Sequence, residues 1–224
     1  MGKLIVIEGS CDGVGKSTQY KLLIDRLINE KEYDITSHHF PSYGTYQGRP
    51  VEEYLKGNYG KISNLSPYFV NSLYAQDRAI TWITGLKQEY DKGNIIVLDR
   101  YTTSSLIYQS SVIDNPKEKE DFINYVYDYE YNKIGIPEPD LVIFLHVPFD
   151  LARSLKNKRT NNEGVKNDIH ESDYEYLKRA SDTSIDIAKK YNWSFIECSS
   201  NNEMRLPEDI HEDIYKLVKE KFYN

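Results

Sequence analysis

A glycine-rich run near the start of the chain carries the residue types that bind phosphate. Residues 9–18 read Gly-Ser-Cys-Asp-Gly-Val-Gly-Lys-Ser-Thr and follow a short apolar segment. A glycine-rich turn between a strand and a helix points successive backbone N–H groups into one concavity, and the helix N-terminus adds partial positive charge. Lys16 can reach the β- and γ-phosphates of a nucleoside triphosphate, and the Ser17 hydroxyl can ligate Mg²⁺. We therefore predict a triphosphate site formed by Ser10, Cys11, Asp12, Gly13, Val14, Gly15, Lys16, Ser17 and Thr18.

The spacing within this run departs from the usual pattern, Gly-x4-Gly-Lys-Ser/Thr. Counting back from Gly15 places Ser10 at the first glycine position, and Gly9 stands one residue too early. The loop therefore either carries one extra residue or uses Ser10 in place of the first glycine.

A second group of reactive side chains, Asp99 and Arg100, follows another apolar segment. In an open α/β sheet, ligands bind at the carboxyl ends of the strands. A carboxylate at that position can hold Mg²⁺, and a neighbouring arginine can bind phosphate through two hydrogen bonds. The other interpretation is an ion pair that caps a strand, which is less favoured beside a phosphate loop.

The elements that must position these groups follow from the apolar pattern. Nearly continuous apolar segments indicate strands buried on both faces of a parallel sheet. They lie at residues 3–8, 35–40, 94–99, 140–146 and 193–198. Helical spacing is found over residues 67–90, 171–191 and 207–222, and after the glycine-rich run, where Leu22, Leu23, Leu27 and Ile28 share one predicted face.

The alternation of strands and helices predicts an α/β fold of three layers. We expect a P-loop NTPase fold, with a central parallel five-stranded sheet flanked by helices, in a single domain over residues 1–224. The polar stretch at residues 156–168 is the one candidate for a mobile excursion, and a solvated loop is its simplest interpretation.

The composition argues against some classes of binding partner. The net charge is −7 at pH 7, whereas a protein that binds a nucleic acid polymer is normally basic. No apolar segment approaches the roughly 20 residues that a membrane-spanning helix needs. Cys11 and Cys198 are too few for a disulfide framework and are typical of reduced thiols. We expect a cytoplasmic protein that binds neither a nucleic acid polymer nor a membrane.

Six segments resemble, in chain order, the motifs of the thymidylate kinase family of nucleoside monophosphate kinases. They are Glu8-Gly9 with residues 12–19, Phe-Pro-Ser-Tyr-Gly at 40–44, Tyr-Ala-Gln-Asp-Arg at 74–78, Asp-Arg-Tyr-Thr-Thr-Ser-Ser-Leu-Ile-Tyr-Gln at 99–109, Pro-Asp-Leu at 139–141 and Asp-Ile-His-Glu at 168–171. The segment at 99–109 is the most specific. The resemblance implies an enzyme that transfers the γ-phosphoryl group of ATP to dTMP, giving dTDP and ADP in dTTP synthesis, with Mg²⁺ as cofactor. It also implies a homodimer, formed through the helix at 67–90, and a lid over about residues 156–170.

The resemblance further implies roles for individual residues. The substrate-binding set is Phe40, Tyr43, Tyr74, Arg78, Arg100, Ser104, Ser105, Tyr108 and Gln109. Tyr74 would stack on thymine, Arg78 would donate to a base carbonyl, and Tyr108 would exclude a ribose hydroxyl. The catalytic residues would be Lys16, Arg100, Asp12 and the lid residue Arg159. The metal would be held by Ser17 and Asp99. Without the resemblance, Tyr74 and Tyr108 could equally be core residues, and Arg78 could form a surface ion pair with Asp77.

Three departures from the family pattern limit these assignments. Ser42 stands where the family often has an arginine beside the acceptor phosphate, Ile107 replaces a small residue near the sugar, and Ile169 replaces an arginine at the lid border. Another P-loop kinase, acting on a different nucleoside monophosphate or on a deoxynucleoside, remains the alternative. A deoxynucleoside kinase would need a carboxylate base, for which Glu8 or Asp12 is available. A GTPase would need Asn-Lys-x-Asp, and Asn132-Lys133 is followed by Ile-Gly instead.

Overall fold

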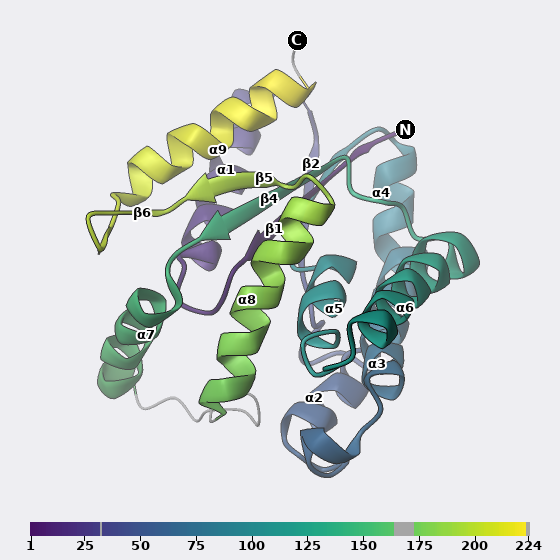
Figure 1. Cartoon of the computed structure of the whole chain (residues 1–224). Helices are drawn as coiled ribbons and strands as arrows, with labels where there is room; N and C mark the ends of the chain where they lie inside the picture. The colour runs from purple at the N-terminus through teal and green to yellow at the C-terminus, as the bar shows by residue number, and fades with distance from the viewer. Residues whose placement is uncertain (32, 164–172, 223–224) are drawn as a thin grey trace.

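A parallel sheet forms the centre of the molecule (Figure 1). The computed structural model describes residues 1–31, 33–163 and 173–222, with the backbone alone over residues 157–163. Within that part of the chain, the sheet has five strands in the order β2-β3-β1-β4-β5, and every neighbouring pair is parallel. The strands are β1 (Lys3–Gly9), β2 (Ile35–His39), β3 (Ile95–Asp99), β4 (Leu141–His146) and β5 (Ser194–Glu197). The predicted α/β fold and its strands are confirmed.

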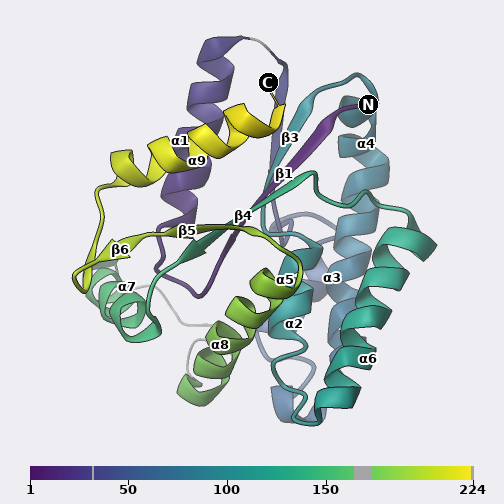
Figure 2. The same cartoon turned by 45° about the horizontal axis from the view of Figure 1, so that its top comes forward.

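The central strand β1 shows why these segments are apolar throughout. Its side chains alternate between the two faces, and Leu4, Ile5, Val6 and Ile7 are all 0% exposed. Ile5 and Ile7 pack with α1 (Lys16–Glu30) and α9 (Pro207–Phe222), while Leu4 and Val6 pack on the opposite face. Helices therefore cover both faces of the sheet, as Figure 2 shows from a second direction.

The opposite face of the sheet is covered by a larger set of helices. A continuous helical run consists of α3 (Pro67–Thr81), the π-helical segment η2 (Trp82–Leu86) and α4 (Lys87–Asp91), so the helix predicted over 67–90 is confirmed. The π turn was not predicted, and it contains Gly85, a residue that weakens regular α-helix. The other elements are α5 (Thr102–Tyr108), α6 (Pro116–Tyr127), the π-helical η3 (Asp128–Ile134) and α8 (Tyr174–Lys190).

The buried face of α1 differs from the predicted one. Leu23 and Leu27 are buried as expected, but Leu22 is only partly buried and Ile28 is 51% exposed. The third fully buried position is Gln19, whose side-chain amide donates to the backbone oxygen of Pro207 at 2.9 Å. The helix thus turns a polar side chain towards α9, because a hydrogen-bond acceptor is available there.

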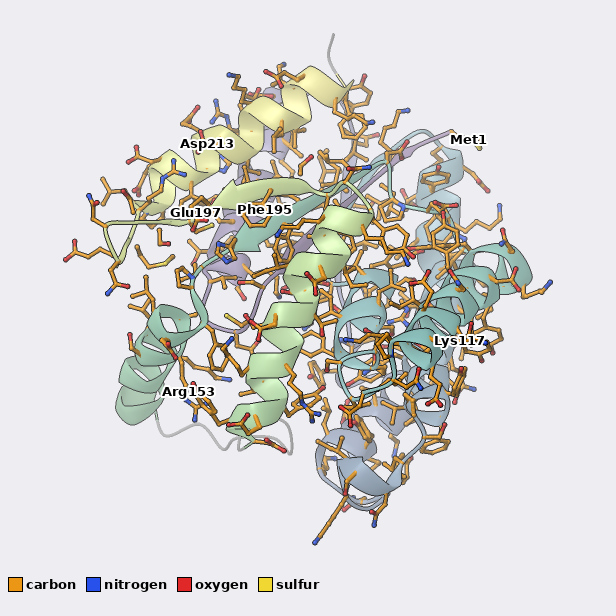
Figure 3. The ribbon with its side chains drawn as sticks, in the orientation of Figure 1. Met1, Lys117, Arg153, Phe195, Glu197 and Asp213 are labelled. Atoms are coloured by element: carbon orange, nitrogen blue, oxygen red, sulfur yellow. The ribbon has the colours of Figure 1, made fainter. Side chains whose placement is uncertain are left out.

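The remaining elements lie at the periphery. They are α2 (Arg49–Leu55), the 3₁₀ turn η1 (Ile62–Asn64), α7 (Phe149–Glu163) and a small antiparallel hairpin of β6 (Ser199–Ser200) and β7 (Glu203–Met204). The first part of the polar stretch, predicted as a loop, continues α7 instead, and residues 164–168 lie outside the described residues. Figure 3 shows Phe195 and Glu197 on the edge strand β5 and Arg153 on α7. Among the described residues, no helix is both long and apolar enough to cross a bilayer.

Candidate active site

The phosphate loop begins where β1 ends. Gly9 is still part of the strand and pairs with Leu145, and a Cβ atom at Gly9 would come within 2.7 Å of the Val14 side chain. Gly9 therefore meets the steric demand of the first glycine. Ser10 is the extra residue: its N–H donates to the Leu145 oxygen at 2.9 Å, and its hydroxyl lies 3.3 Å from the Val147 oxygen. The end of β1 thus accommodates the additional residue through these two contacts.

The cavity that follows is lined by most of the predicted triphosphate residues. They are Cys11, Asp12, Gly13, Gly15, Lys16, Ser17 and Thr18. Ser10 and Val14 are buried behind this lining, each 1% exposed. Gly13 has φ of +92°, and a Cβ atom there would lie 2.7 Å from the Ala152 oxygen of α7. The loop can take this shape only with glycine at position 13, because both the backbone angle and the contact with α7 exclude a side chain.

Cys11 brings a thiol into this cavity. Burial raises the pKa of the Cys11 thiol to about 11. The group is therefore protonated at neutral pH and does not add a negative charge beside bound phosphates.

Lys16 and Asp99 meet between the loop and the end of β3. The Lys16 Nζ atom contacts one oxygen of Asp99, and His39 Nδ1 lies 3.0 Å from the other. Burial alone would raise the pKa of Asp99, but the hydrogen bond from His39 and the charge of Lys16 hold it at about 2. Burial and the nearby Arg100 lower the pKa of Lys16. His39 was missed by sequence analysis, although it stands opposite Asp99 in the parallel register of β2 and β3.

Arg100 and Asp12 form a second ion pair beside the loop. Arg100 is a non-glycine residue with φ of +66°, a left-handed conformation that is uncommon for such residues. Its Nη2 atom donates to Asp12 Oδ1 at 2.9 Å, and Lys156 of α7 donates to Asp12 Oδ2 at 3.2 Å. Burial alone would raise the pKa of Asp12, but Arg100 and Lys156 outweigh it and lower that pKa. Asp12 thus stays ionised between two cations.

A pocket adjoins this pair on the side of α5. Eight predicted site residues line it: Asp12, Tyr43, Tyr74, Arg100, Ser104, Ser105, Tyr108 and Gln109. Pro41, Leu55, Tyr176 and Leu177 also line it and were not predicted. Tyr176 and Leu177 come from α8, and the sequence offers no motif there that marks them. The structure therefore brings seven of the nine predicted substrate-binding residues together beside the phosphate loop.

Phe40 and Arg78, which were predicted to contact the substrate, are buried and do not line the pocket. Phe40 is 2% exposed, and its ring lies 6.1 Å from that of Tyr101 in the core. It precedes a cis peptide bond to Pro41 and anchors the segment that carries Tyr43. Ser42, at the family's arginine position, also faces inward, where its N–H donates to Asp77 at 2.8 Å.

Arg78 lies behind the pocket wall and is 1% exposed. Its carboxylate partner is Glu130 of η3, with Arg78 Nε and Nη2 at 2.6 and 2.7 Å from the two carboxylate oxygens. The interpretation of Arg78 as a surface ion pair with Asp77 is therefore wrong. Glu130 was missed because nothing in the sequence links two residues 52 positions apart. Ile107, expected near the sugar, is 0% exposed in the core instead.

The predicted lid is described only in part. The backbone of Arg159 belongs to α7, but its side chain lies outside the described residues, as do the whole of residues 164–170. Earlier on α7, Arg153 lies over the ring of Tyr174 at 4.7 Å, and Lys156 contacts Asp12. The described part of α7 thus joins the phosphate loop through Lys156, a residue that sequence analysis passed over in favour of Arg159.

Comparisons with known proteins agree with this arrangement. A family model described as thymidylate kinase matches residues 7–214. Thymidylate kinase from Plasmodium falciparum is 30% identical, over 97% of this chain and 90% of that protein, and the one from Schizosaccharomyces pombe is 29% identical, over 97% and 91%. A solved structure of thymidylate kinase from Candida albicans superposes with a TM-score of 0.73 at 21% identity, covering 98% of this chain and 92% of that one.

Proposed function

Because this chain belongs to the thymidylate kinase family, we infer that it transfers the γ-phosphoryl group of ATP to dTMP, giving dTDP and ADP. One observation of the site carries this function: Asp12 lines both the phosphate loop cavity and the neighbouring pocket. A donor held by the loop and an acceptor held in the pocket would therefore meet beside Asp12 and Arg100. This is the arrangement that direct transfer between two bound nucleotides requires.

The chemistry needs positioning and charge neutralisation more than proton transfer. The acceptor is already a phosphate oxyanion, since its second pKa is about 6. No general base is required, and the main difficulty is to bring two polyanions together in line. Lys16 serves the donor phosphates, and Arg100 serves the acceptor phosphate. We propose Arg159 as a further cation from the lid and Asp12 as the partner of the sugar 3′-hydroxyl.

The residues present fit a magnesium ion held together with ATP. Asp99 is an ionised carboxylate at a strand end, and Ser17 supplies a hydroxyl oxygen in the adjoining cavity. In the described ranges, no three His, Cys, Asp or Glu side chains cluster as a metal site. Mg²⁺ at such sites takes one or two protein oxygens and completes its shell with phosphates and water. When bound, it neutralises charge on the β- and γ-phosphates, and Ser17 and Asp99 would hold it.

In the acceptor pocket, we propose that Tyr74 stacks on thymine and that Tyr108 packs against the sugar. Tyr74 meets Tyr54 edge to face, with ring centroids 6.2 Å apart, so its ring plane is fixed. Tyr108 lies beneath the Arg100 guanidinium, 5.2 Å from the ring centroid. This contact supports the proposal, because a sugar attached to a phosphate bound by Arg100 would lie near the Tyr108 ring. Ser104 and Gln109 complete the polar lining.

Replacing Tyr108 by Ala is expected to relax the preference for deoxyribose. The preference for dTMP over ribothymidine monophosphate, measured as a ratio of kcat/KM values, should fall about tenfold, since steric discrimination of one small group is worth about 1–3 kcal/mol. Tyr108→Phe keeps the ring and is the control, for which the ratio should stay near the wild-type value. An unchanged ratio in Tyr108→Ala would return Tyr108 to a packing role.

The alternative of a deoxynucleoside kinase would need a free carboxylate base. Glu8 is 0% exposed and accepts hydrogen bonds from Thr103 at 2.9 Å and Ser104 at 2.6 Å. Asp12 accepts hydrogen bonds from Arg100 and Lys156, so neither carboxylate is free to act as a base. An ADP-release assay with ATP and dTMP, dUMP, UMP, dCMP, dGMP or thymidine tests the proposal directly. Turnover with dTMP above all others is expected, and turnover with thymidine in its place would overturn it.

We further propose a homodimer, a cytoplasmic location and a single domain. The helical run of α3, η2 and α4 exposes Phe69 and Ile83, which are 42% and 68% exposed and lie on the same side of the helix. A second copy of the run would cover them. Sedimentation equilibrium tests the dimer, and a monomer at micromolar concentration would contradict it. Cys11 and Cys198 are both buried and free, which is typical of a reducing compartment.

A further inference from the structure

A third cavity lies beside the start of β4 and β5, whereas the phosphate loop follows the end of β1. Its volume is about 260 Å³, against about 120 Å³ for the acceptor pocket and about 100 Å³ for the phosphate-loop cavity. It shares no lining residue with either of them. The proposed phosphoryl transfer therefore gives this cavity no role.

The lining of the third cavity combines four aromatic rings with two carboxylates. These residues are Tyr127, Tyr131, Tyr191, Trp193, Glu138 and Asp140. The rings of Tyr127 and Tyr191 are nearly parallel, with centroids 6.0 Å apart, and Tyr131 meets Tyr127 edge to face at 4.8 Å. Tyr131 belongs to the π-helical η3, and π-helical turns are frequent at functional sites. Because the rings pack on one another, this wall of the cavity is formed before any ligand arrives.

Glu138 is the carboxylate around which the three tyrosines gather. The Tyr127 hydroxyl donates to Glu138 Oε2, and no described residue is recorded as a partner of Oε1. Burial, together with the hydrogen bond and the charge of Glu138, raises the pKa of Tyr127 to about 12. Burial and neighbouring carboxylates, Glu138 among them, also raise the pKa values of Tyr131 and Tyr191. The charge of Glu138 thus acts on all three hydroxyls, and one of its oxygens is open to a donor.

Two lysines lie near the cavity, and neither pairs with Glu138 in the part of the chain that the structure describes. Lys3 Nζ lies 3.7 Å from Asp140 Oδ1, and the Leu4 N–H donates to Asp140 Oδ2 at 2.8 Å. Lys221 lines the cavity and is exposed to solvent. Asp140 is therefore partly neutralised, whereas Glu138 keeps its full charge towards the cavity. A ligand that carries phosphate would be repelled there.

We propose that this cavity binds a small aliphatic amine in its ammonium form, with Glu138 as the carboxylate partner and the aromatic rings around the alkyl chain. An alkylammonium ion has N–H donors for the open oxygen of Glu138, and it keeps its proton at neutral pH. Aromatic faces attract a cation within about 6 Å and also cover methylene groups. Binding of the amine does not depend on the proposed phosphoryl transfer, so the two can be tested separately.

The probe is putrescine, 1,4-diaminobutane, titrated into the nucleotide-free protein and followed by NMR. The chain has two tryptophans, Trp82 and Trp193, and only Trp193 lines the cavity among the described residues. The indole N–H signal of Trp193 should shift to saturation, and that of Trp82 should shift far less. Trp193→Phe assigns the two signals. We expect a Kd of about 1 mM or lower, a range within reach of a ligand with so few atoms.

Butane-1,4-diol has the same chain length as putrescine and no charge, and it should produce no saturable shift. Glu138→Gln should raise the Kd for putrescine about tenfold or more, because a hydrogen bond to a charged group is lost. Asp128→Asn is the matched control. It removes the same charge from the neighbouring η3, where the Asp128 side chain is 53% exposed and outside the lining, so the Kd should stay within about twofold.

Two further substitutions test the rings and the sign of the charge. Tyr191→Leu should weaken putrescine about threefold or more, whereas Tyr191→Phe keeps the ring and should keep the Kd. Lys221→Ala removes a like charge from the lining and should tighten binding. Weaker binding in Lys221→Ala would contradict the choice of a cation as ligand.

The same ammonium group also occurs on lysine side chains of other proteins. Nα-acetyl-lysine N-methylamide carries it on a short peptide backbone, and it should bind more weakly than putrescine, because the cavity lies below the usual range of about 300–1,000 Å³ for ligand sites. Binding as tight as that of putrescine would overturn the assignment to a free amine. Three results would overturn the site itself: no saturable shift of Trp193, an equal shift with butane-1,4-diol, or an unchanged Kd in Glu138→Gln.

Discussion

Replacing Lys16 by Met is expected to lower kcat with ATP and dTMP by about a thousandfold. Removing one preorganised donor from a transition-state site typically costs about 10²–10³ in rate, and Lys16 is the donor that we propose for the transferred phosphoryl group. The side chain is 11% exposed and contacts Asp99, so it is already held in place before ATP arrives. Methionine keeps most of the volume, which limits the change to the ammonium group.

Lys21→Met is the matched control, because Lys21 lies on the exposed side of the same helix and should leave turnover unchanged. Steady-state kinetics and ATP binding by calorimetry are measured together. A loss confined to the KM for ATP would show that Lys16 contributes equally to ground-state and transition-state binding. A kcat within tenfold of the wild-type value would contradict a role of Lys16 in the phosphoryl-transfer step.

Replacing Arg100 by Ala should reduce turnover with dTMP by at least about a hundredfold while ATP still binds. Arg100 lines the pocket proposed for the acceptor, contacts Asp12 at 2.9 Å and lies 3.7 Å from Glu8. Its loss would remove the cation that we propose for the acceptor phosphate. Near-normal turnover would remove Arg100 from the mechanism.

Arg100→Gly refines this experiment because of the left-handed backbone at that position. Alanine keeps a Cβ atom at φ of +66° and retains the strain, whereas glycine adopts such angles freely. Comparable loss of turnover in both variants is expected, since the charge is missing from each. Activity restored in Arg100→Gly alone would attribute the effect to the backbone rather than to the guanidinium.

The fold was predictable because buried parallel strands have a strong signature. Residues 95–99 and 141–146 are apolar at nearly every position, and both form strands in which every residue except His146 is buried. Strand ends then placed Asp99 beside the phosphate loop by topology alone. Which face of a helix is buried was harder to predict. The exposure of Ile28 depends on which element packs against α1, and that element is α9, near the end of the chain.

Most of the lining of the pocket was predictable from motifs, whereas the contribution of α8 and the layer behind the lining were not. Tyr74 and Ser105 belong to recognisable segments, and both line the pocket. Arg78 was recognised from its motif, but the carboxylate that holds it lies in a segment without one. Buried partners of this kind are chosen by three-dimensional proximity, and a single sequence carries no record of it. The same reason explains why Lys156 was passed over.

Asp12 lines two cavities and divides its oxygens between two cations, with Oδ1 accepting from Arg100 and Oδ2 from Lys156. A phosphate that draws Arg100 away alters the field that this carboxylate presents to the neighbouring cavity. The free energies of binding for the two nucleotides are therefore linked, and linkage is reciprocal: the factor by which dTMP changes the affinity for ATP equals the factor by which ATP changes the affinity for dTMP. A substitution at residue 12 would thus shift both Michaelis constants. An inhibitor that occupies one cavity would likewise change the affinity for the nucleotide in the other cavity.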